Sequence, residues 1–413
     1  MDYFFPNPKP ATLVLLRQAP LGPYLGLFAK ELRERGFSVG AGRKMIILIV
    51  QFGRWLRLNR ITVPEITSEH AAKYTEYLVR KKRFAVKRGD AAVIRHFLDL
   101  LRRTGAIAKE VVPLLSRAEE LTHEFLLYLQ KERGLLATTI ACRRMFVLRF
   151  LNSYITDPTV DLSALCSSDV VTFVQRQAAR VSPKGAAQML TALRSFLHYA
   201  RYQGYIQIDL AAAVPAVASW SMQSIPRSLP KKQVEQVISS CNRQTAIGRR
   251  DYAILLLLAR LGLRAGEVAS LSLDDIDWQA GSISVHGKSG HRPHLPLPDD
   301  VGEALAEYLR EGRPRLDSRV VFLSGNAPVR PIRSSVVTDV VKRQLERAGI
   351  DSPRKGAHQF RHGLATEMLR HGASLGEIGE LLGHRNPDTT AIYAKVDLDS
   401  LRALAMPWPG GEI

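Results

Sequence analysis

Residues 358–393 read HQFRHGLATEMLRHGASLGEIGELLGHRNPDTTAIY, and this stretch decides how the rest of the chain is interpreted. Arg361 stands among apolar residues of an expected helix, His384 follows a Leu-Leu-Gly sequence, and Tyr393 comes nine residues after that histidine. The Asn-Pro-Asp sequence between them is typical of a turn, so Tyr393 is expected on a separate segment. We expect these side chains to belong to one site.

A second arginine occurs upstream in a similar apolar setting. Residues 261–271 read LGLRAGEVASL and hold Arg264 one helical turn before Glu267. Because an arginine among core-facing residues is costly unless paired, one interpretation is a structural salt bridge between these two side chains. The other is a site for a phosphodiester, since in-line displacement at phosphorus needs fixed cations around the non-bridging oxygens. Arginine suits that role because its planar fork binds two oxygens and stays charged.

Two histidines flank Arg361 at a spacing that zinc sites also use. His358 and His362 are four residues apart and share one helix face. The sequence HQFRH lacks the glutamate of an H-E-x-x-H metal site, and no convincing third ligand is evident. We therefore expect neither a metal nor another cofactor.

The charge of the chain points to a polyanionic partner. The 413 residues carry 58 Lys and Arg against 39 Asp and Glu, a net charge of +19. Residues 1–110 alone hold 21 Lys and Arg against 9 Asp and Glu. Such an excess favours nucleic acid, because each phosphate that is neutralised releases condensed counterions. A solubilising surface is the plainer interpretation, but the concentration of charge in the first quarter favours a DNA-binding N-terminal part.

Three cysteines, Cys142, Cys166 and Cys241, are far apart in the sequence, which predicts neither a disulfide framework nor a Cys-x-x-Cys metal site. The apolar runs at 45–50 and 253–259 are too short to cross a bilayer, and the N-terminus lacks a signal-peptide pattern. We expect a cytoplasmic, nucleoid-associated protein that does not enter a membrane.

The first half of the chain contains a repeat with a period of about one hundred residues. Four blocks recur in the same order: FAKELRERG (28–36) with LLYLQKERG (126–134), MIILIVQFGRWL (45–56) with RMFVLRFLNSY (144–154), EITSEHAAKY (65–74) with ALCSSDVVTF (164–173), and IRHFLDLLRRTGAI (94–107) with LRSFLHYARYQGYI (193–206). Each copy is predicted to be a bundle of about four amphipathic helices whose last helix stops at a glycine, Gly105 or Gly204. Coincidence between generic helices is the alternative to duplication.

A dense basic run, RKKRFAVKR, lies between two expected helices of the first copy. A solvated loop is the commoner use of such a run, but in a basic bundle we predict contact with a phosphate backbone. The residues in question are Arg80, Lys81, Lys82, Arg83, Lys87 and Arg88.

These observations predict a mainly α-helical, multidomain fold. Residues 1–110 are expected to form a basic helical domain and 111–213 a second helical domain, with 214–230, which contain three prolines, as a linker. Residues 231–413 are expected to form a mixed α+β domain whose small sheet includes a hairpin at 282–298.

The order of these motifs resembles the tyrosine recombinase (phage integrase) family. The resemblance rests on Arg264, Lys288, the His358-x-x-Arg361-His362 cluster, Leu-Leu-Gly-His384 and Tyr393, and it covers residues 230–400 approximately. Residues 116–206 also resemble the helical core-binding domain that precedes the catalytic domain in that family.

The resemblance implies a role for each residue. Tyr393 would attack the scissile phosphate and leave a 3′-phosphotyrosine, with His358 as general base. Arg264, Arg361 and His384 would hold the phosphoryl oxygens, and Lys288 would protonate the leaving 5′-oxygen. Glu267 and His362 would be supporting residues.

The resemblance also implies a site-specific DNA recombinase that acts in integration or transposition, on double-stranded DNA and as a tetramer, with partner recombinases as a further option. Two alternatives stay open at this stage. One is DNA relaxation of the type IB topoisomerase kind, and the other is a DNA-binding protein without catalysis.

Overall fold

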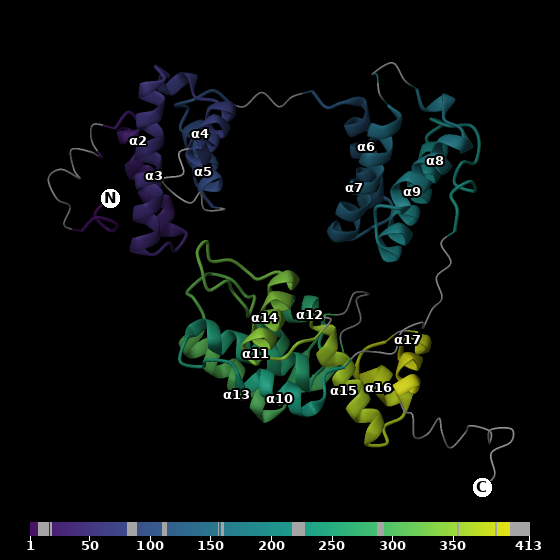
Figure 1. The fold of residues 1–413 in the computed structure, drawn as a ribbon. Helices are drawn as coiled ribbons and strands as arrows, with labels where there is room; N and C mark the ends of the chain where they lie inside the picture. The colour runs from purple at the N-terminus through teal and green to yellow at the C-terminus, as the bar shows by residue number, and fades with distance from the viewer. Residues whose placement is uncertain are drawn as a thin grey trace, which may run out of the picture. The chain divides into compact units, whose positions relative to one another are not determined.

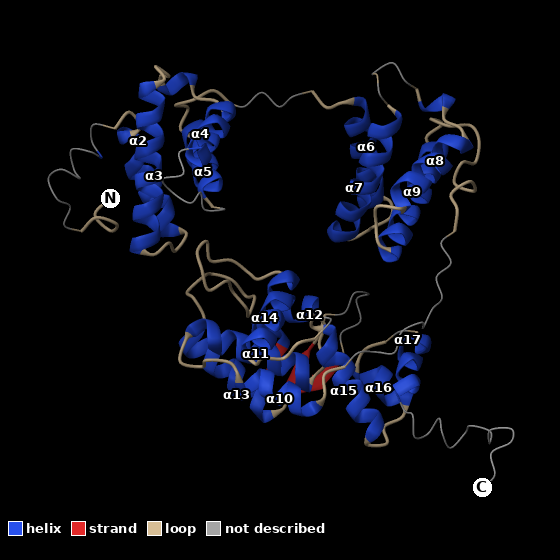
Figure 2. Ribbon diagram, viewed as in Figure 1, coloured by secondary structure: helices blue, strands red, loops and turns tan. Residues whose placement is uncertain are grey.

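The computed structural model describes residues 1–6, 16, 19–80, 89–109, 114–155, 157, 161–216, 228–286, 293–352, 355–384 and 386–396. Residues 111–221 form one compact unit, and residues 1–110 together with 222–413 are grouped as the other. The structure is mainly helical, and its described strands form one small sheet (Figure 2). The predicted fold class is confirmed. Most of the expected linker, residues 217–227, lies outside the described residues.

Among its described residues, the first bundle has four α-helices and a 3-10 helix (Figure 1), which pack around a core of their own. They are α2 (Gly22–Glu34), α3 (Val39–Leu58), η1 (Val63–Glu65), α4 (Ser68–Arg80) and α5 (Asp90–Arg103). Phe28 on α2 and Phe97 on α5 meet edge to face, with ring centroids 5.1 Å apart. Both side chains are fully buried, so this aromatic contact ties the first helix of the bundle to the last.

The second bundle repeats the same order of elements. It consists of α6 (Arg117–Lys131), α7 (Ala137–Tyr154), η2 (Leu162–Ala164), α8 (Ser167–Ala178) and α9 (Pro183–Tyr202). Phe125 and Phe196 meet edge to face at 5.5 Å, which matches the aromatic contact of the first bundle. The last helix of each bundle ends two residues before a glycine, Gly105 or Gly204, with φ of 74° and 79°. The predicted glycine stops are confirmed, because this left-handed conformation favours glycine.

The third part is built around α11 (Ala246–Arg260), which is the most buried helix of the chain's C-terminal half. Residues 253–258 are all buried, and a helix that is apolar on every side belongs inside a core. The helices and turns around it are α10 (Lys231–Ser239), α12 (Ala265–Ser270), η3 (Leu273–Asp275), α13 (Asp299–Glu307), the π-helical turn η4 (Tyr308–Gly312) and α14 (Ser334–Arg347).

The sheet has three short antiparallel strands in the order β1 (Ile276–Asp277), β2 (Ser282–Ser284) and β3 (His294–Pro296). Ile283 pairs with Ile276 on one side and with Leu295 on the other, and all three side chains are buried. The predicted hairpin corresponds to β2 and β3. The sequence analysis did not include β1, because a strand of two residues leaves no periodic pattern.

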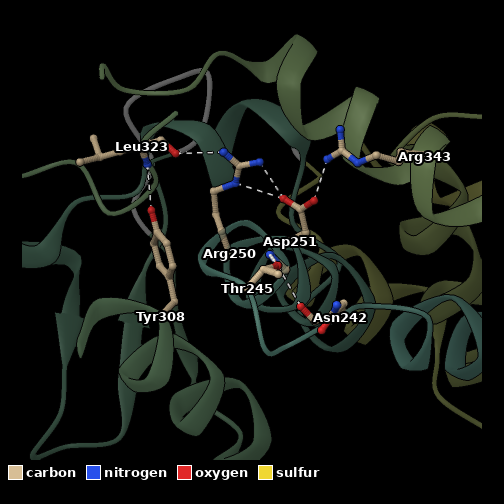
Figure 3. Close-up of polar contacts among 8 residues, drawn as sticks. Asn242, Thr245, Arg250, Asp251, Tyr308, Leu323 and Arg343 are labelled. Atoms are coloured by element: carbon tan, nitrogen blue, oxygen red, sulfur yellow. Dashed lines mark hydrogen bonds and ion pairs between the residues drawn. The ribbon is translucent and has the colours of Figure 1, made fainter. Parts of the chain in front are cut away.

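A buried polar network fixes the start of α11 to its neighbours (Figure 3). The carboxylate of Asp251, which is only 1% exposed, accepts hydrogen bonds from Arg250 at 2.8 Å and from Arg343 of α14 at 2.6 Å. Arg250 also donates to the carbonyl oxygen of Leu323, whose own N–H donates to the Tyr308 hydroxyl. A buried carboxylate needs such partners, and here two arginines supply them.

The C-terminal helices form a smaller cluster of their own. They are α15 (His358–Arg370), α16 (Leu375–Leu381), α17 (Pro387–Ala391) and the 3-10 turn η5 (Ile392–Val396). Ser374 begins α16 with a capping box, in which its hydroxyl accepts from the Glu377 N–H and the Glu377 carboxylate accepts from the Ser374 N–H. The buried residues of the cluster are Ala365, Ile378, Leu382 and Tyr393.

Candidate active site

Arg264 lies at the start of α12, where Glu267 holds it in place. The Glu267 carboxylate accepts one hydrogen bond from the Arg264 backbone N–H at 2.8 Å and another from its guanidinium Nη1 at 2.6 Å. Glu267 is 8% exposed, whereas 29% of the Arg264 side chain remains accessible. The salt bridge that the sequence suggested is therefore present, and it leaves part of the guanidinium open.

Arg361 on α15 is held by main-chain oxygens from two distant segments. It is 5% exposed, and its guanidinium donates to the carbonyl oxygens of Gly262, at 2.7 Å, and Leu382. Burial, and then the charge of Arg264, lower the pKa of Arg361 to about 10. The guanidinium thus stays protonated at neutral pH although it lies deep in the protein.

Gly262 permits this arrangement. Its φ is 60°, a conformation that favours glycine, and a Cβ at this position would come within 2.8 Å of the Leu382 side chain. The turn after α11 therefore brings the Gly262 carbonyl oxygen to Arg361 and leads directly into Arg264.

Both arginines line a cleft of about 610 Å³. The wall includes Glu267, Pro293 next to β3, and His384. Among the described residues, those that line the cleft do not include Tyr393. The cleft thus presents fixed cations and an imidazole, whereas the Tyr393 phenol is buried and does not line the cleft.

His384 is held between α16 and α17. Its Nδ1 lies 2.8 Å from the hydroxyl oxygen of Thr390, a threonine that the sequence analysis did not single out. Burial, followed by the charges of Arg361 and Arg264, lowers the pKa of His384 to about 4, so the imidazole is neutral near pH 7.

Tyr393 is 1% exposed and belongs to the apolar cluster of the C-terminal helices. Its hydroxyl oxygen lies 3.0 Å from Nδ1 of His362, and its ring is nearly parallel to that of His384 with centroids 6.5 Å apart. Burial raises the pKa of the phenol, while the charges of Arg361 and Arg264 act in the opposite direction. The nucleophile that the resemblance indicates is thus protonated in this structure.

Two further residues were predicted to act in catalysis, His358 and Lys288. His358 is exposed at the first position of α15, with its ring 6.5 Å from that of His362. The predicted base is therefore on the expected helix face, but the histidine in contact with the Tyr393 hydroxyl is His362. Lys288 lies outside the described residues.

Of the predicted DNA-contacting residues, Arg80 is exposed at the last position of α4. The others, Lys81, Lys82, Arg83, Lys87 and Arg88, lie outside the described residues. Their contact with DNA stays a prediction.

Among the described residues there is neither a membrane-spanning helix nor a cluster of metal ligands. Within these ranges no helix is both long and apolar enough to cross a membrane. The described His, Cys, Asp and Glu side chains also contain no group of three or more that could hold a metal ion.

Comparison with known proteins places the chain in a family. Residues 227–399 match the phage integrase family. The chain is 50% identical to the "Putative integrase/recombinase y4rA" of Sinorhizobium fredii over 95% of its own length and 96% of the relative's. The chain belongs to the tyrosine recombinase (phage integrase) family.

Other members of the family match a large part of this recombinase. The tyrosine recombinase XerD of Listeria monocytogenes is 34% identical over 67% of the chain and 94% of its own length. Among solved structures, XerH site-specific recombinase bound to its palindromic difH substrate matches with a TM-score of 0.55 and 19% identity, covering 68% of this chain and 83% of that one. At that identity, the likeness concerns the fold.

Proposed function

We propose that this recombinase cleaves and rejoins DNA strands at specific sites through a phosphotyrosine at Tyr393. The observation that supports this most directly is the arrangement of Arg264, Arg361 and His384 along one cleft, with the Tyr393 ring stacked behind the imidazole. A scissile phosphate in the cleft would meet two guanidinium groups and one neutral donor. Such fixed groups stabilise the charge that develops on phosphoryl oxygens during displacement.

The strand-cleavage step follows from this arrangement. The Tyr393 oxygen forms a bond to phosphorus while the bond from phosphorus to the 5′-oxygen breaks, which yields a 3′-phosphotyrosine. The phenol proton passes to His358, and Lys288 gives a proton to the leaving 5′-oxygen. In the reverse direction, the 5′-hydroxyl of another strand attacks the phosphotyrosine, so the exchange conserves bond energy.

Tyr393 must leave its observed position before it reacts. Its hydroxyl is occupied by His362 and its ring is packed beside Leu382 and Ile378 in the small cluster. Movement of η5, the turn that carries Tyr393, would bring the hydroxyl into the cleft and toward His358, while Thr390 on α17 stays beside His384. His362 thus holds the Tyr393 hydroxyl at rest, and His358 accepts its proton during the attack.

The DNA partner is double-stranded DNA, and the helical bundles would hold it by contacts to its phosphates. We assign residues 1–110 and 111–213 to two DNA-binding domains, 214–230 to a linker and 231–413 to catalysis. The excess of positive charge, strongest before residue 110, would supply most of the affinity. Arg80 and the basic run after it are assigned to phosphate contacts.

We further propose a tetramer on paired DNA sites, with a role in integration or transposition in the cytoplasm and nucleoid. The names of the relatives suggest this biological role, since they are integrases and recombinases. A partner recombinase would be needed only if the purified chain failed to recombine two sites by itself.

A suicide-substrate assay tests the proposal. The purified full-length chain is incubated with nicked duplexes drawn from the DNA that flanks its gene, and covalent protein–DNA adducts are separated under denaturing conditions. We expect the wild-type chain to form an adduct and Tyr393→Phe to form none, with DNA binding retained.

Tyr308→Phe is the matched control for this assay. Tyr308 is also about 1% exposed and its hydroxyl is also hydrogen-bonded, but it lies in the network of Figure 3. Equal adduct from Tyr393→Phe and Tyr308→Phe would overturn the assignment of the nucleophile.

A further inference from the structure

The hydroxyl of Thr390 occupies a tightly enclosed place beside His384. Thr390 is 2% exposed, and its Oγ1 lies 2.8 Å from Nδ1 of His384. Gly379 of α16 makes room for it, because a Cβ at Gly379 would come within 3.0 Å of the same oxygen. The backbone N–H of His384 donates to the Gly379 carbonyl oxygen at 2.8 Å, which fixes the main chain at this point.

The direction of this hydrogen bond follows from the chemistry of the two groups. A threonine hydroxyl has one proton to donate, and a neutral imidazole has one nitrogen that accepts and one that donates. Among the described residues, His384 is the hydrogen-bond partner of the Thr390 hydroxyl. If Nδ1 carried the proton, the hydroxyl hydrogen would be left without an acceptor in an enclosed place, which costs roughly 1–3 kcal/mol.

The lower-energy arrangement has Thr390 as donor and Nδ1 as acceptor. The ring proton then resides on Nε2, the nitrogen at the other side of a side chain that lines the cleft. The low pKa of His384 keeps the ring neutral in the free protein, so one tautomer rather than the doubly protonated form determines what it presents.

We propose that Thr390 is a positioning residue that fixes His384 in its Nε2–H tautomer and aims this N–H at a non-bridging oxygen of the scissile phosphate. The assignment of the tautomer stands on the free protein, and its effect on phosphate rests on the proposed function. A neutral N–H donor adds directional stabilisation to that of the two arginines without a third positive charge in the cleft.

Nuclear magnetic resonance of the free protein tests the tautomer without DNA. The full-length chain is labelled with ¹⁵N in its histidines, and two-bond nitrogen–proton correlations show which ring nitrogen carries the proton. The His384 signals are assigned by their loss in His384→Asn. We expect protonated Nε2 and a hydrogen-bonded Nδ1 in the wild type.

Two variants sharpen this measurement. Thr390→Val keeps the size of the side chain but removes its hydroxyl, so the Nδ1 resonance is expected to shift to that of a nitrogen without a hydrogen bond. Thr390→Ser restores the hydroxyl and is expected to restore the wild-type resonance. A proton on Nδ1 in the wild type, or an Nδ1 resonance that is the same with Val as with Thr, would overturn the inference.

The cleavage assay then measures the consequence. We expect Thr390→Val to slow adduct formation by roughly ten- to a hundredfold, as loss of a group that orients a catalytic partner does in other sites. Thr390→Ser is expected to stay within about threefold of the wild type. Thr122→Val is the matched control, because Thr122 is equally buried and donates to a helix carbonyl oxygen in the second bundle.

The tautomer of His384 and its effect on cleavage are tested by different measurements. If the wild type shows the Nε2–H tautomer but never forms an adduct, the proposed function fails and the role of Thr390 in holding the tautomer stands. If adduct forms normally in Thr390→Val although the Nδ1 resonance shifts, the proposed effect on the phosphate is wrong.

Discussion

The cations and the nucleophile of the candidate site are carried by two cores of very different size. Arg264 follows α11, whose residues form the main hydrophobic core of the C-terminal half. Tyr393 belongs to the small cluster with Ala365, Ile378 and Leu382. Since stability rises with the apolar surface that is buried, the small cluster should open more easily than the main core. We infer that the side of the cleft that carries Arg264 is rigid, whereas the segment that carries Tyr393 is able to move.

Arg361 connects the two cores and should give the largest effect on activity. It bonds to the carbonyl oxygens of Gly262, next to the main core, and Leu382, in the small cluster. Arg361→Lys keeps a positive charge but cannot reproduce the planar fork. We expect single-turnover adduct formation to fall by roughly 10²- to 10³-fold.

Arg343→Lys is the control for Arg361→Lys. Arg343 also pairs with main-core groups, through Asp251, but lies outside the residues that line the cleft. Its cleavage rate should remain within about threefold of the wild type. An equal loss in both variants would mean that Arg361 acts only through stability.

A pair of core substitutions tests whether the small cluster opens more easily than the main core. Ile254 in α11 and Ile378 in α16 are both fully buried. Ile254→Ala should lower the free energy of unfolding of the surrounding domain by roughly 2–5 kcal/mol, as measured by denaturant titration. Ile378→Ala should instead speed amide hydrogen exchange mainly at 387–396, with the protection of α11 nearly unchanged. Equal acceleration in both segments would show that the two cores open together.

Glu267 offers a smaller test of the rigid side. Its negative charge supports the protonated form of Arg361, so Glu267→Gln should lower the pKa of Arg361 further below about 10. At neutral pH, cleavage should fall about tenfold because Arg264 loses its partner. In addition, the lower pKa of Arg361 should move the alkaline limb of the rate–pH profile to lower pH. An unchanged alkaline limb would separate Glu267 from Arg361.

The smallest expected effect concerns His384 and acid stability. Its folded pKa, about 4, lies below the usual value of 6.5, so the unfolded chain binds more protons between these values. Stability due to this group is complete above pH 6.5 and is lost as the pH falls toward 4. The wild type should lose on the order of 1 kcal/mol more than His384→Asn between pH 7 and 5, a figure reduced for partial solvent screening. Equal losses in thermal denaturation of the two proteins would contradict this assignment.

Sequence patterns predicted the parts of the molecule that depend on local periodicity. The repeated helices and their glycine stops, and the hairpin that includes β2 and β3, all follow from spacing, turn residues and burial. The meeting of Arg264 with Arg361 was predicted only as a resemblance, because contacts between residues nearly one hundred positions apart leave no local signal.

Other features of the site were not visible in the sequence. His358 and His362 share a helix face, and spacing alone does not decide which one reaches Tyr393. In the sequence, Thr390 cannot be distinguished from any other threonine in a helix. Its contact with His384 is visible only in the structure. The carbonyl oxygens that bind Arg361 belong to the main chain, so residue identity does not reveal them. The role of Lys288 and of the basic run after Arg80 stays a prediction.

Mass spectrometry of the covalent adduct identifies the nucleophile itself. The adduct formed by the full-length wild-type chain on a nicked duplex is digested with protease and nuclease, and the peptide that carries nucleotide is sequenced. We predict a phosphotyrosine at residue 393 joined to the 3′ end of the cleaved strand. Nucleotide on another residue, or attached through a 5′-phosphate, would show that Tyr393 is not the nucleophile of a 3′-linked intermediate.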